Sequence, residues 1–396
     1  MINWQLFKDL LSIDSTSGKE RETALWLYDH LDAPQKELME VPDGTLNLLC
    51  SWGTPRVVFC THMDTVPPYI APVFPEGFPF GGHVHPRTWV GGGARCDSSG
   101  RGRSEQSERS SSEGETLRIS GRGSCDAKGQ LFAMYTACKE LEASGFTDFG
   151  LLLLAGEETG SWGAKAFAQT DFKAPYLIVG EPTDNKMVSA SKGTLSYDLK
   201  FTGEPFHSGY PQYGCSAIDL FHAFYSLLKA MDFGQDPVLG ATTWNVGLLH
   251  SDNPQNILAP ELTCRLYFRT TFVSHQAVQE WMVEAGREVL LPGAFARTGL
   301  QSDAEGKDLS SAALTVTARG GDTPARYLTL PGFASAPVAF GSDAPHLSNF
   351  THKAICGPGS IRVAHRPQEY ITVSDLETAV QQYVKMYAVL QYFESQ

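Results

Sequence analysis

Residues 56–67 read RVVFCTHMDTVP, and this stretch indicates the fold class. Its first half is a short apolar run rich in β-branched residues, which is typical of a buried parallel strand. The run ends at His62 and Asp64, so polar side chains lie at the carboxyl end of the strand. Because open α/β sheets bind ligands at that edge, the stretch predicts a parallel sheet with a functional site at the end of this strand.

Two later apolar runs repeat this arrangement. Residues 151–155 lead into Glu157 and Glu158, and residues 176–179 lead into Glu181. Each run has the length of a strand and is followed by acidic side chains. We therefore expect one α/β sheet whose strand ends face a single crevice.

Helical signals lie around the predicted strands. A helix is expected over residues 18–31, where Ser17 and Glu20 have the spacing of a capping box. Further helices are expected over residues 127–144 and from residue 374 to about 393. Alternating strands and helices are typical of the α/β class.

The pattern changes from about residue 190. Residues 195–202 and 262–271 alternate apolar and polar side chains, and residues 216–231 have a helical pattern. Two strands with a helix favour a small α+β module of the ferredoxin-like kind.

We therefore expect two domains, which the length of 396 residues also favours. Residues 1–189 and 301–396 are expected to form a discontinuous α/β domain with a mixed, mostly parallel sheet, and residues 190–300 a smaller inserted domain. Residues 91–115 contain seven Ser and six Gly, a composition that cannot support a packed element. They predict a mobile polar insertion over about 87–119, with a lid or a regulatory Ser-rich loop as the alternative.

The composition argues against several classes of protein. The chain has 31 Lys and Arg against 44 Asp and Glu, a net charge of −13, which disfavours nucleic acids and anionic membranes as partners. Its apolar runs fall short of the roughly 20 residues that a membrane span requires. The N-terminus lacks a basic region and a cleavage site for export, and the eight cysteines are scattered without a CxxC pair. This usage is typical of reduced thiols and predicts a cytoplasmic protein.

Polar groups at the strand ends, together with two later positions in the chain, suit a metal centre. Two imidazoles and several carboxylates without cysteine favour zinc first and then cobalt or manganese. Burying so many carboxylates together requires cations, because like charges at short range cannot all ionise. A pair of divalent ions would resolve this, and hydrolases use such pairs to generate hydroxide at neutral pH. The candidate residues are His62, Asp64, Asp126, Glu157, Glu158, Glu181 and His365.

Each of these residues also has an ordinary structural interpretation. Glu157 and Glu158 could be the acidic start of a helix, and Asp126 could be a helix N-cap. Two other classes of protein stay open at this point. One is a metal-free binding protein on the same fold, and the other is a nucleotide-dependent transferase or dehydrogenase. The sequence has neither the Walker spacing nor GxGxxG at its Gly-rich turn, which disfavours the nucleotide enzyme.

Six motifs, in this order, carry a resemblance to a known family. The chain resembles the di-zinc amidohydrolase and metallopeptidase family of acetylornithine deacetylase, succinyl-diaminopimelate desuccinylase, glutamate carboxypeptidase and aminoacylase. The resemblance covers nearly the whole chain outside residues 83–119. The motifs are THMDTVP (61–67), GRGSCDAKG (121–129), AGEETGSWGAK (155–165), VGEPTD (179–184), GEPFHSGYP (203–211) and GPGSIRVAHRPQEYI (357–371).

The resemblance implies a ligand set for two divalent ions, with Zn²⁺ first and Co²⁺ as the alternative. His62 and Glu181 match the ligands of one ion, and Glu158 and His365 match those of the other. Asp126 matches the residue that bridges both ions.

The resemblance also implies catalytic roles. Asp64 matches the carboxylate that orients the metal-bound imidazole. Glu157 matches the general base that takes a proton from the attacking water and delivers it to the leaving amine.

The larger domain is then catalytic, and the inserted domain matches the family's lid and dimerisation domain, so a homodimer is expected. His207 matches the lid histidine that reaches the partner subunit's active site. Asn256 and Arg269 match the positions that hold the substrate's carboxylate. Ser342 and Gly359 are expected to line the pocket.

The resemblance implies hydrolysis of an amide bond in a small N-acylated amino acid. N-Acetylornithine is the preferred substrate, which would place the chain in arginine biosynthesis. Desuccinylation of succinyl-diaminopimelate and dipeptide or glutamate carboxypeptidase activity are the alternatives within the family.

Overall fold

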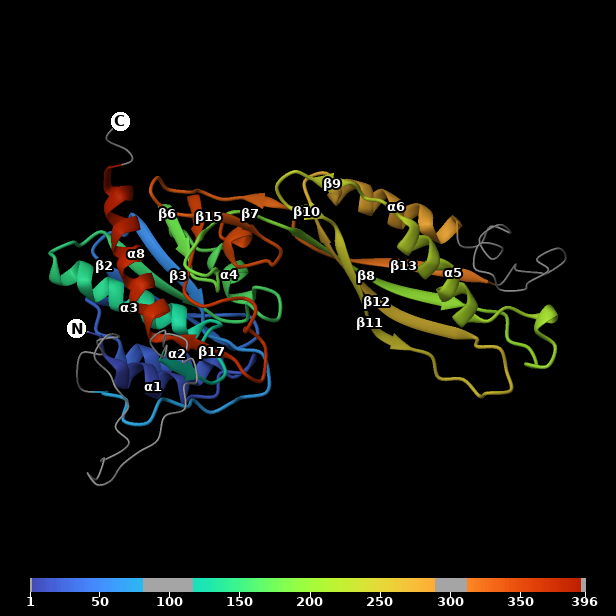
Figure 1. The fold of residues 1–396 in the computed structure, drawn as a ribbon, viewed down its shortest axis with the longest axis horizontal. Coiled ribbons are helices and arrows are strands. Elements are labelled where there is room, and N and C mark those ends of the chain that lie inside the picture. Colours follow the sequence, from blue (N-terminus) through green and yellow to red (C-terminus); the bar gives the residue numbers. More distant parts are fainter. Residues whose placement is uncertain (1, 81–116, 289–311, 393–396) are drawn as a thin grey trace, which may run out of the picture. The chain divides into compact units, whose positions relative to one another are not determined.

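The computed structural model describes residues 2–80, 117–288 and 312–392 of the chain (Figure 1). It divides into two compact units. The first unit comprises Met1–Val188, Tyr327–Ala336 and Ser342–Gln396, and the second comprises Ser189–Arg326 and Pro337–Gly341. The insertion expected over about 87–119 lies outside the described residues except at its end, where Arg118–Ser120 forms the short strand β4. Among the described residues, no helix combines the length and apolar character needed to cross a bilayer.

A six-stranded sheet of order β1-β2-β5-β3-β6-β16 organises the first unit. Strand β3 pairs in parallel with β5 and β6, and β16 pairs in parallel with β6, whereas β1 and β2 are antiparallel. The expected mixed, mostly parallel sheet is confirmed. Every residue of β2, β3 and β5 is buried, as expected for strands covered on both faces. The bounds are Gln35–Glu40 (β1), Leu46–Trp52 (β2), Val57–His62 (β3), Phe149–Leu154 (β5), Ala174–Val179 (β6) and Phe350–Ile355 (β16).

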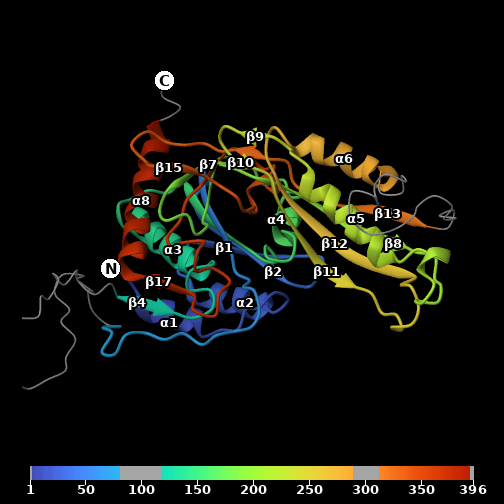
Figure 2. The same cartoon turned by 45° about the vertical axis from the view of Figure 1, so that its right-hand side comes forward.

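Helices pack against this sheet, and aromatic side chains form part of the core. Helix α3 packs against β3, β5 and α8, and Figure 2 shows α3 and α8 side by side. Trp4 and Phe7 of α1 pack against Phe132 of α3. The helices are Trp4–Leu11 (α1), Glu20–His30 (α2), Lys128–Ala143 (α3), Trp162–Phe167 (α4) and Val373–Tyr392 (α8), with a 3₁₀ turn at Ala344–His346 (η2).

Several short strands complete the topology. Tyr370–Thr372 (β17) pairs with β4 in an antiparallel ribbon. A three-stranded sheet is formed by Met187–Ser191 (β7), Ala325–Arg326 (β14) and Ser335–Val338 (β15). A further ribbon pairs Gln235–Asp236 (β9) with Gly240–Ala241 (β10).

The second unit is an antiparallel sheet of order β11-β12-β8-β13 with two helices along one face (Figures 1 and 2). Alternate residues of β12 are buried, which gives the period-2 pattern of a sheet covered on one side. The elements are Gly193–Thr202 (β8), Ala217–Ala230 (α5), Thr243–His250 (β11), Glu261–Thr270 (β12), His275–Glu288 (α6) and Ala313–Gly320 (β13), with a 3₁₀ turn at Pro211–Tyr213 (η1).

The boundary expected at residue 300 differs from the structure. The second unit continues to Arg326, because β13 pairs along the free side of β8. Leu314 and Val316 of this strand pack against the core of the second unit. Residues 313–320 therefore complete the smaller sheet instead of returning to the larger one.

Candidate metal centre

The three strand-end segments predicted to share a crevice do lie together. In the parallel register, His62 of β3 is opposite Leu154 at the end of β5. Glu157 and Glu158 lie shortly after the end of β5, and Glu181 lies shortly after β6, which neighbours β3 on its other side. The sheet order thus explains why side chains far apart in the sequence meet at one edge.

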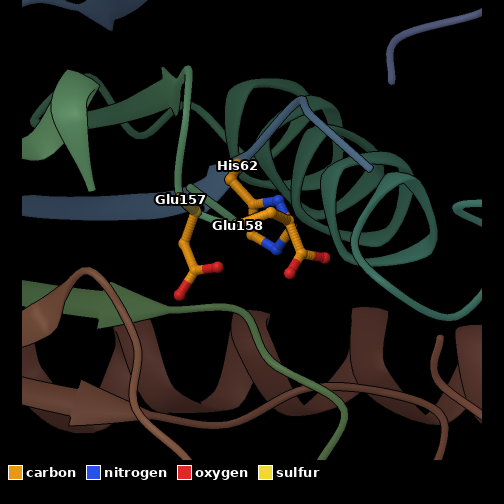
Figure 3. Close-up of side chains that lie close together, drawn as sticks. All are labelled: His62, Glu157 and Glu158. Carbon is orange, nitrogen blue, oxygen red and sulfur yellow. The ribbon is translucent and has the colours of Figure 1, made fainter. Parts of the chain in front are cut away.

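Potential metal ligands form three overlapping groups. In each group, one ligand atom per residue lies within 4.8 Å of the others. Figure 3 shows the first group, with the His62, Glu157 and Glu158 side chains extending into the same space. The other two groups both contain Asp126: one adds His62 and Glu181, and the other adds Glu158 and His365. All five predicted metal ligands, and Glu157, therefore come together.

Asp126 lies between the two imidazoles. Its Oδ1 is 3.1 Å from His62 Nε2, and its Oδ2 is 3.1 Å from His365 Nε2. His365 Nε2 is also 2.9 Å from Glu158 Oε1. The two carboxylate oxygens of Asp126 thus face different ligand groups, as a bridging residue requires.

Asp64 organises the loop beside this centre. The ring Nδ1 of His62 is 2.9 Å from the backbone oxygen of Asp64 and 3.4 Å from its Oδ1, which leaves Nε2 facing Asp126. The carboxylate accepts hydrogen bonds from the backbone N–H groups of Glu157, at 3.0 Å, and Glu158, at 3.1 Å. Burial alone would raise the pKa of Asp64, but these hydrogen bonds and His62 hold it below its usual value.

The chemistry of the site fits divalent cations. Burial and the charges of Asp343 and Glu158 raise the pKa of Glu157 well above its usual range, against the opposing effect of His62. Burial and the charge of Glu157 also raise the pKa of Glu181. Its buried Oε1 has no hydrogen-bond partner among the described residues. Such a surplus of buried carboxylate oxygens is stable with bound cations and costly without them.

His365 is the most exposed of the predicted ligands. Its side chain is 48% exposed, and its backbone has a φ of 63°, in the left-handed region that is uncommon for residues other than glycine. Hydrogen bonds with Asp126 and Glu158 raise the pKa of His365 to about 10. An unusual backbone conformation at a residue with two carboxylate partners indicates a position held for function.

The second unit holds His207 and Asn256 close to each other and Arg269 apart from them. His207 bridges to Ile257, and the backbone N–H of Ser208 donates to the backbone oxygen of Asn256 at 2.9 Å. Arg269 lies at the other end of β12 from Glu261, roughly 26 Å away at the rise of a β-strand. Its guanidinium lies over the ring of Tyr267, 5.0 Å from the centroid.

Ser342 and Gly359 have local structural roles. Ser342 Oγ accepts a hydrogen bond from the backbone N–H of Ala344, the first residue of η2. Gly359 has a φ of 76°, and a Cβ there would lie 2.6 Å from Cys125 Sγ. Their contribution to a substrate pocket stays a prediction.

The structure adds residues to the site that the sequence analysis did not assign to it. Ser17 Oγ donates to Asp64 Oδ2 at 3.0 Å, so Ser17 does not form the expected capping box. Helix α2 begins at Glu20, whose carboxylate accepts from the backbone N–H of Gly18 instead. Asp343 is buried beside the cluster, and burial raises its pKa to about 6. The position of Asp343 directly after Ser342 was the available signal.

Comparison with known proteins identifies the family. The profile of peptidase family M20/M25/M40 matches residues 104–388. A probable carboxypeptidase of Aspergillus fumigatus is 27% identical over 96% of this chain and 84% of its own length. An M20 domain-containing protein of Schizosaccharomyces pombe is 29% identical over 96% of this chain and 83% of its own length.

Solved structures show the same fold. A tripeptidase of Staphylococcus aureus has a TM-score of 0.70 and 18% identity, covering 97% of this chain and 96% of its own. An M20 metallo-carboxypeptidase of Sulfolobus solfataricus has a TM-score of 0.62 and 17% identity, covering 98% of both chains. A dinuclear metal-binding M20 peptidase of Bacillus subtilis also has a TM-score of 0.62, with 11% identity over 98% of this chain and 97% of its own. The chain therefore belongs to peptidase family M20/M25/M40 and is a metallopeptidase that hydrolyses amide bonds.

Proposed function

We propose that this metallopeptidase is a di-metal carboxypeptidase that releases the C-terminal residue of short peptides, free or N-acylated. One observation carries the proposal: the two oxygens of Asp126 face His62 and His365, which belong to different ligand groups. The relatives named carboxypeptidases favour a substrate with a free C-terminal carboxylate. N-Acetylornithine and succinyl-diaminopimelate are the alternative substrates.

The ligand groups suit two divalent ions, with Zn²⁺ first and Co²⁺ as the alternative. His62 and Glu181 would hold one ion, Glu158 and His365 the other, and Asp126 both. Bound ions of this kind supply polarisation of the scissile carbonyl and a water of lowered pKa.

Glu157 is the proposed general base. It extends into the same space as the ligand side chains of His62 and Glu158 without being needed in either Asp126 group (Figure 3). Burial raises the pKa of Glu157, so its carboxylate is suited to take a proton from the attacking water and keep it. The same oxygen then donates that proton to the departing amine nitrogen.

Asp64 is the proposed positioning residue for this step. Its carboxylate accepts from the backbone N–H groups of both Glu157 and Glu158, so it holds base and ligand in register. Its contacts with His62 Nδ1 leave Nε2 of that ring for the metal.

We propose that the second unit binds the substrate carboxylate and forms a homodimer. Arg269 offers a planar fork for a carboxylate, and Asn256 offers an amide. His207 and Asn256 lie at the opposite end of β12 from Arg269. Their separation within one copy of the unit favours joint action on one substrate by two copies. In this arrangement His207 of one copy stabilises the oxyanion in the other.

Ser342 and Gly359 are proposed to line the pocket through backbone and hydroxyl groups. The seven described cysteines are all buried and free of disulfides, which favours a reducing, cytoplasmic location.

The test combines metal content with a substrate panel. The purified chain is loaded with Zn²⁺ or Co²⁺, and metal per chain is measured together with hydrolysis of a free dipeptide, an N-acylated dipeptide, N-acetylornithine and succinyl-diaminopimelate. About two ions per chain and turnover of the peptides, lost when their C-terminus is amidated, is the expected result. Turnover of N-acetylornithine alone would identify a deacetylase instead. A folded chain without metal or turnover would identify a binding protein.

A matched variant isolates the base. Glu157→Gln keeps the size of the side chain and is expected to bind the metal ions normally but to lose on the order of 10²–10⁴ in kcat. Near-normal kcat in this variant would show that another group takes the proton.

A further inference from the structure

Glu369 is a buried carboxylate that contacts the loop of Asp126. Its Oε1 accepts hydrogen bonds from the backbone N–H groups of Cys125, at 3.0 Å, and Asp126, at 3.1 Å. Its Oε2 accepts from Arg122 Nη1 at 2.5 Å. Both Glu369 and Arg122 are almost completely buried, so the pair is shielded from solvent.

The pair connects three segments that each follow or contain a proposed ligand. Arg122 Nε donates to the backbone oxygen of Pro68, in the segment that follows His62. Arg122 Nη1 also contacts the backbone oxygen of Arg366, next to His365, at 3.4 Å. The backbone of Glu369 accepts from Gly121 N–H at 3.1 Å.

A buried ion pair of this kind is weak evidence for stability. The cost of removing both charges from water offsets most of their attraction, and a well-packed apolar pair is often equally stable. What a buried, hydrogen-bonded pair supplies is a defined geometry. Here the geometry it defines is that of the Asp126 backbone relative to the segments of His62 and His365.

We propose that Arg122 and Glu369 are positioning residues for the metal centre. They fix Asp126 between the two ligand groups without providing a ligand themselves. The inference rests on the proposed role of Asp126 as the bridging ligand. It assigns the ion pair to metal affinity and coordination geometry, and not to substrate contact.

The test compares variants of the pair with a structural control. Glu369→Ala removes both acceptor oxygens, whereas Glu369→Gln keeps an acceptor for the two backbone N–H groups and loses the charge opposite Arg122. The control is Asn349→Ala. Asn349 is also buried, and its Nδ2 lies within hydrogen-bond distance of three backbone oxygens at the amino-terminal edge of β6 and β16. Strands of this length place that edge roughly 20 Å from their carboxyl ends.

Zinc affinity is measured on each full-length variant by competition with a chelator, and unfolding by urea is followed on the same samples without metal. Glu369→Ala is expected to bind Zn²⁺ on the order of 10–100-fold more weakly, the usual effect of losing a group that supports metal ligands. Glu369→Gln should lose less, because its amide oxygen still accepts from Asp126. Asn349→Ala should unfold more easily but bind Zn²⁺ as the wild type does.

A second readout is the visible spectrum of the Co²⁺-loaded protein, which reports coordination geometry. The spectrum should change in both Glu369 variants and stay unchanged in Asn349→Ala. Wild-type zinc affinity and spectrum in Glu369→Gln and Glu369→Ala would overturn the inference while leaving the proposed function intact. A weakening as large in Asn349→Ala would also overturn it, since the effect would then follow stability alone. Absence of metal binding by the wild type would refute both.

Discussion

Replacing His365 with asparagine should change stability in a pH-dependent way in the metal-free protein. Asparagine tolerates the left-handed conformation at this position, where φ is 63°, so the backbone can keep its shape. The variant loses the imidazolium that contacts Asp126 and Glu158. In the wild type these contacts raise the pKa of His365 from 6.5 to about 10.

The direction of the stability change with pH follows from proton binding by His365. Because the folded state holds the proton more tightly than the unfolded state, the stabilisation is fully present below pH 6.5 and is lost as the pH rises through about 10. The full shift would correspond to about 5 kcal/mol in a buried group. The side chain is 48% exposed, and solvent screening reduces the expected contribution to roughly 2 kcal/mol.

The assay is urea unfolding of both proteins with a chelator at several pH values from 6 to 10. The relevant quantity is the difference in the free energy of unfolding between wild type and variant. Lys128 also changes stability in this pH range, but in both proteins and in the opposite direction, so its effect is removed by the subtraction. Burial lowers the pKa of Lys128 to about 7. We expect the variant to be less stable by roughly 2 kcal/mol at pH 6, with the difference shrinking toward pH 10. A difference that is constant, or that grows with pH, would refute the assignment of these contacts.

Three further predictions concern the same centre. Ser17→Ala removes a hydrogen bond to the Asp64 carboxylate and should cost about 1–3 kcal/mol in chemical unfolding together with a measurable loss of kcat; unchanged stability and kcat would show that this bond is dispensable. Gly359→Ala should lower Tm, since its Cβ would lie 2.6 Å from Cys125 Sγ at a φ of 76°; a wild-type Tm would show that the close approach to Cys125 does not require glycine. Zn²⁺ binding should release protons, because burial raises the pKa of Glu181 and the metal binds its deprotonated carboxylate. Calorimetry in buffers of different ionisation enthalpy measures this release, and a buffer-independent heat would argue against it.

Much of the centre could be predicted because its signals are local. A buried strand has a short apolar run, and a polar residue shortly after it is visible without any knowledge of pairing. His62, Glu158 and Glu181 each follow such a run. The parallel order of β5, β3 and β6 then places them at one edge, which is the general position of ligand sites in these sheets.

The boundary of the second unit was wrong because it depends on a long-range pairing. Residues 313–320 have a strand pattern, but nothing local shows which of two sheets they join. Their partner is β8, more than a hundred residues earlier in the chain. Leu314 and Val316 would be apolar strand residues in either sheet, so periodicity alone could not decide.

The segment at Ser17 shows how a tertiary contact can replace a local motif. Ser17 and Glu20 have the spacing of a capping box, in which the serine oxygen would accept a hydrogen bond from the helix backbone. In the structure that hydroxyl donates to Asp64 instead, and the Glu20 carboxylate accepts from the backbone N–H of Gly18, ahead of the helix. A hydrogen bond to a buried, charged carboxylate is stronger than a hydrogen bond between neutral groups at a helix end. The Ser17 hydroxyl therefore binds the Asp64 carboxylate and not the helix backbone.

The same reasoning explains why Glu369 was not recognised as part of the centre. In the sequence, Glu369 is one acidic residue in the motif that contains His365. Its positioning role depends on three backbone segments that only the fold brings together. Ligand residues can be found from their chemistry, because few side chains bind metals. Residues that hold the ligands can be any donor or acceptor of suitable length, and only the hydrogen-bond geometry distinguishes them. For that reason the zinc affinity of the Glu369 variants, measured against Asn349→Ala, tests a part of this centre that residue type alone does not reveal.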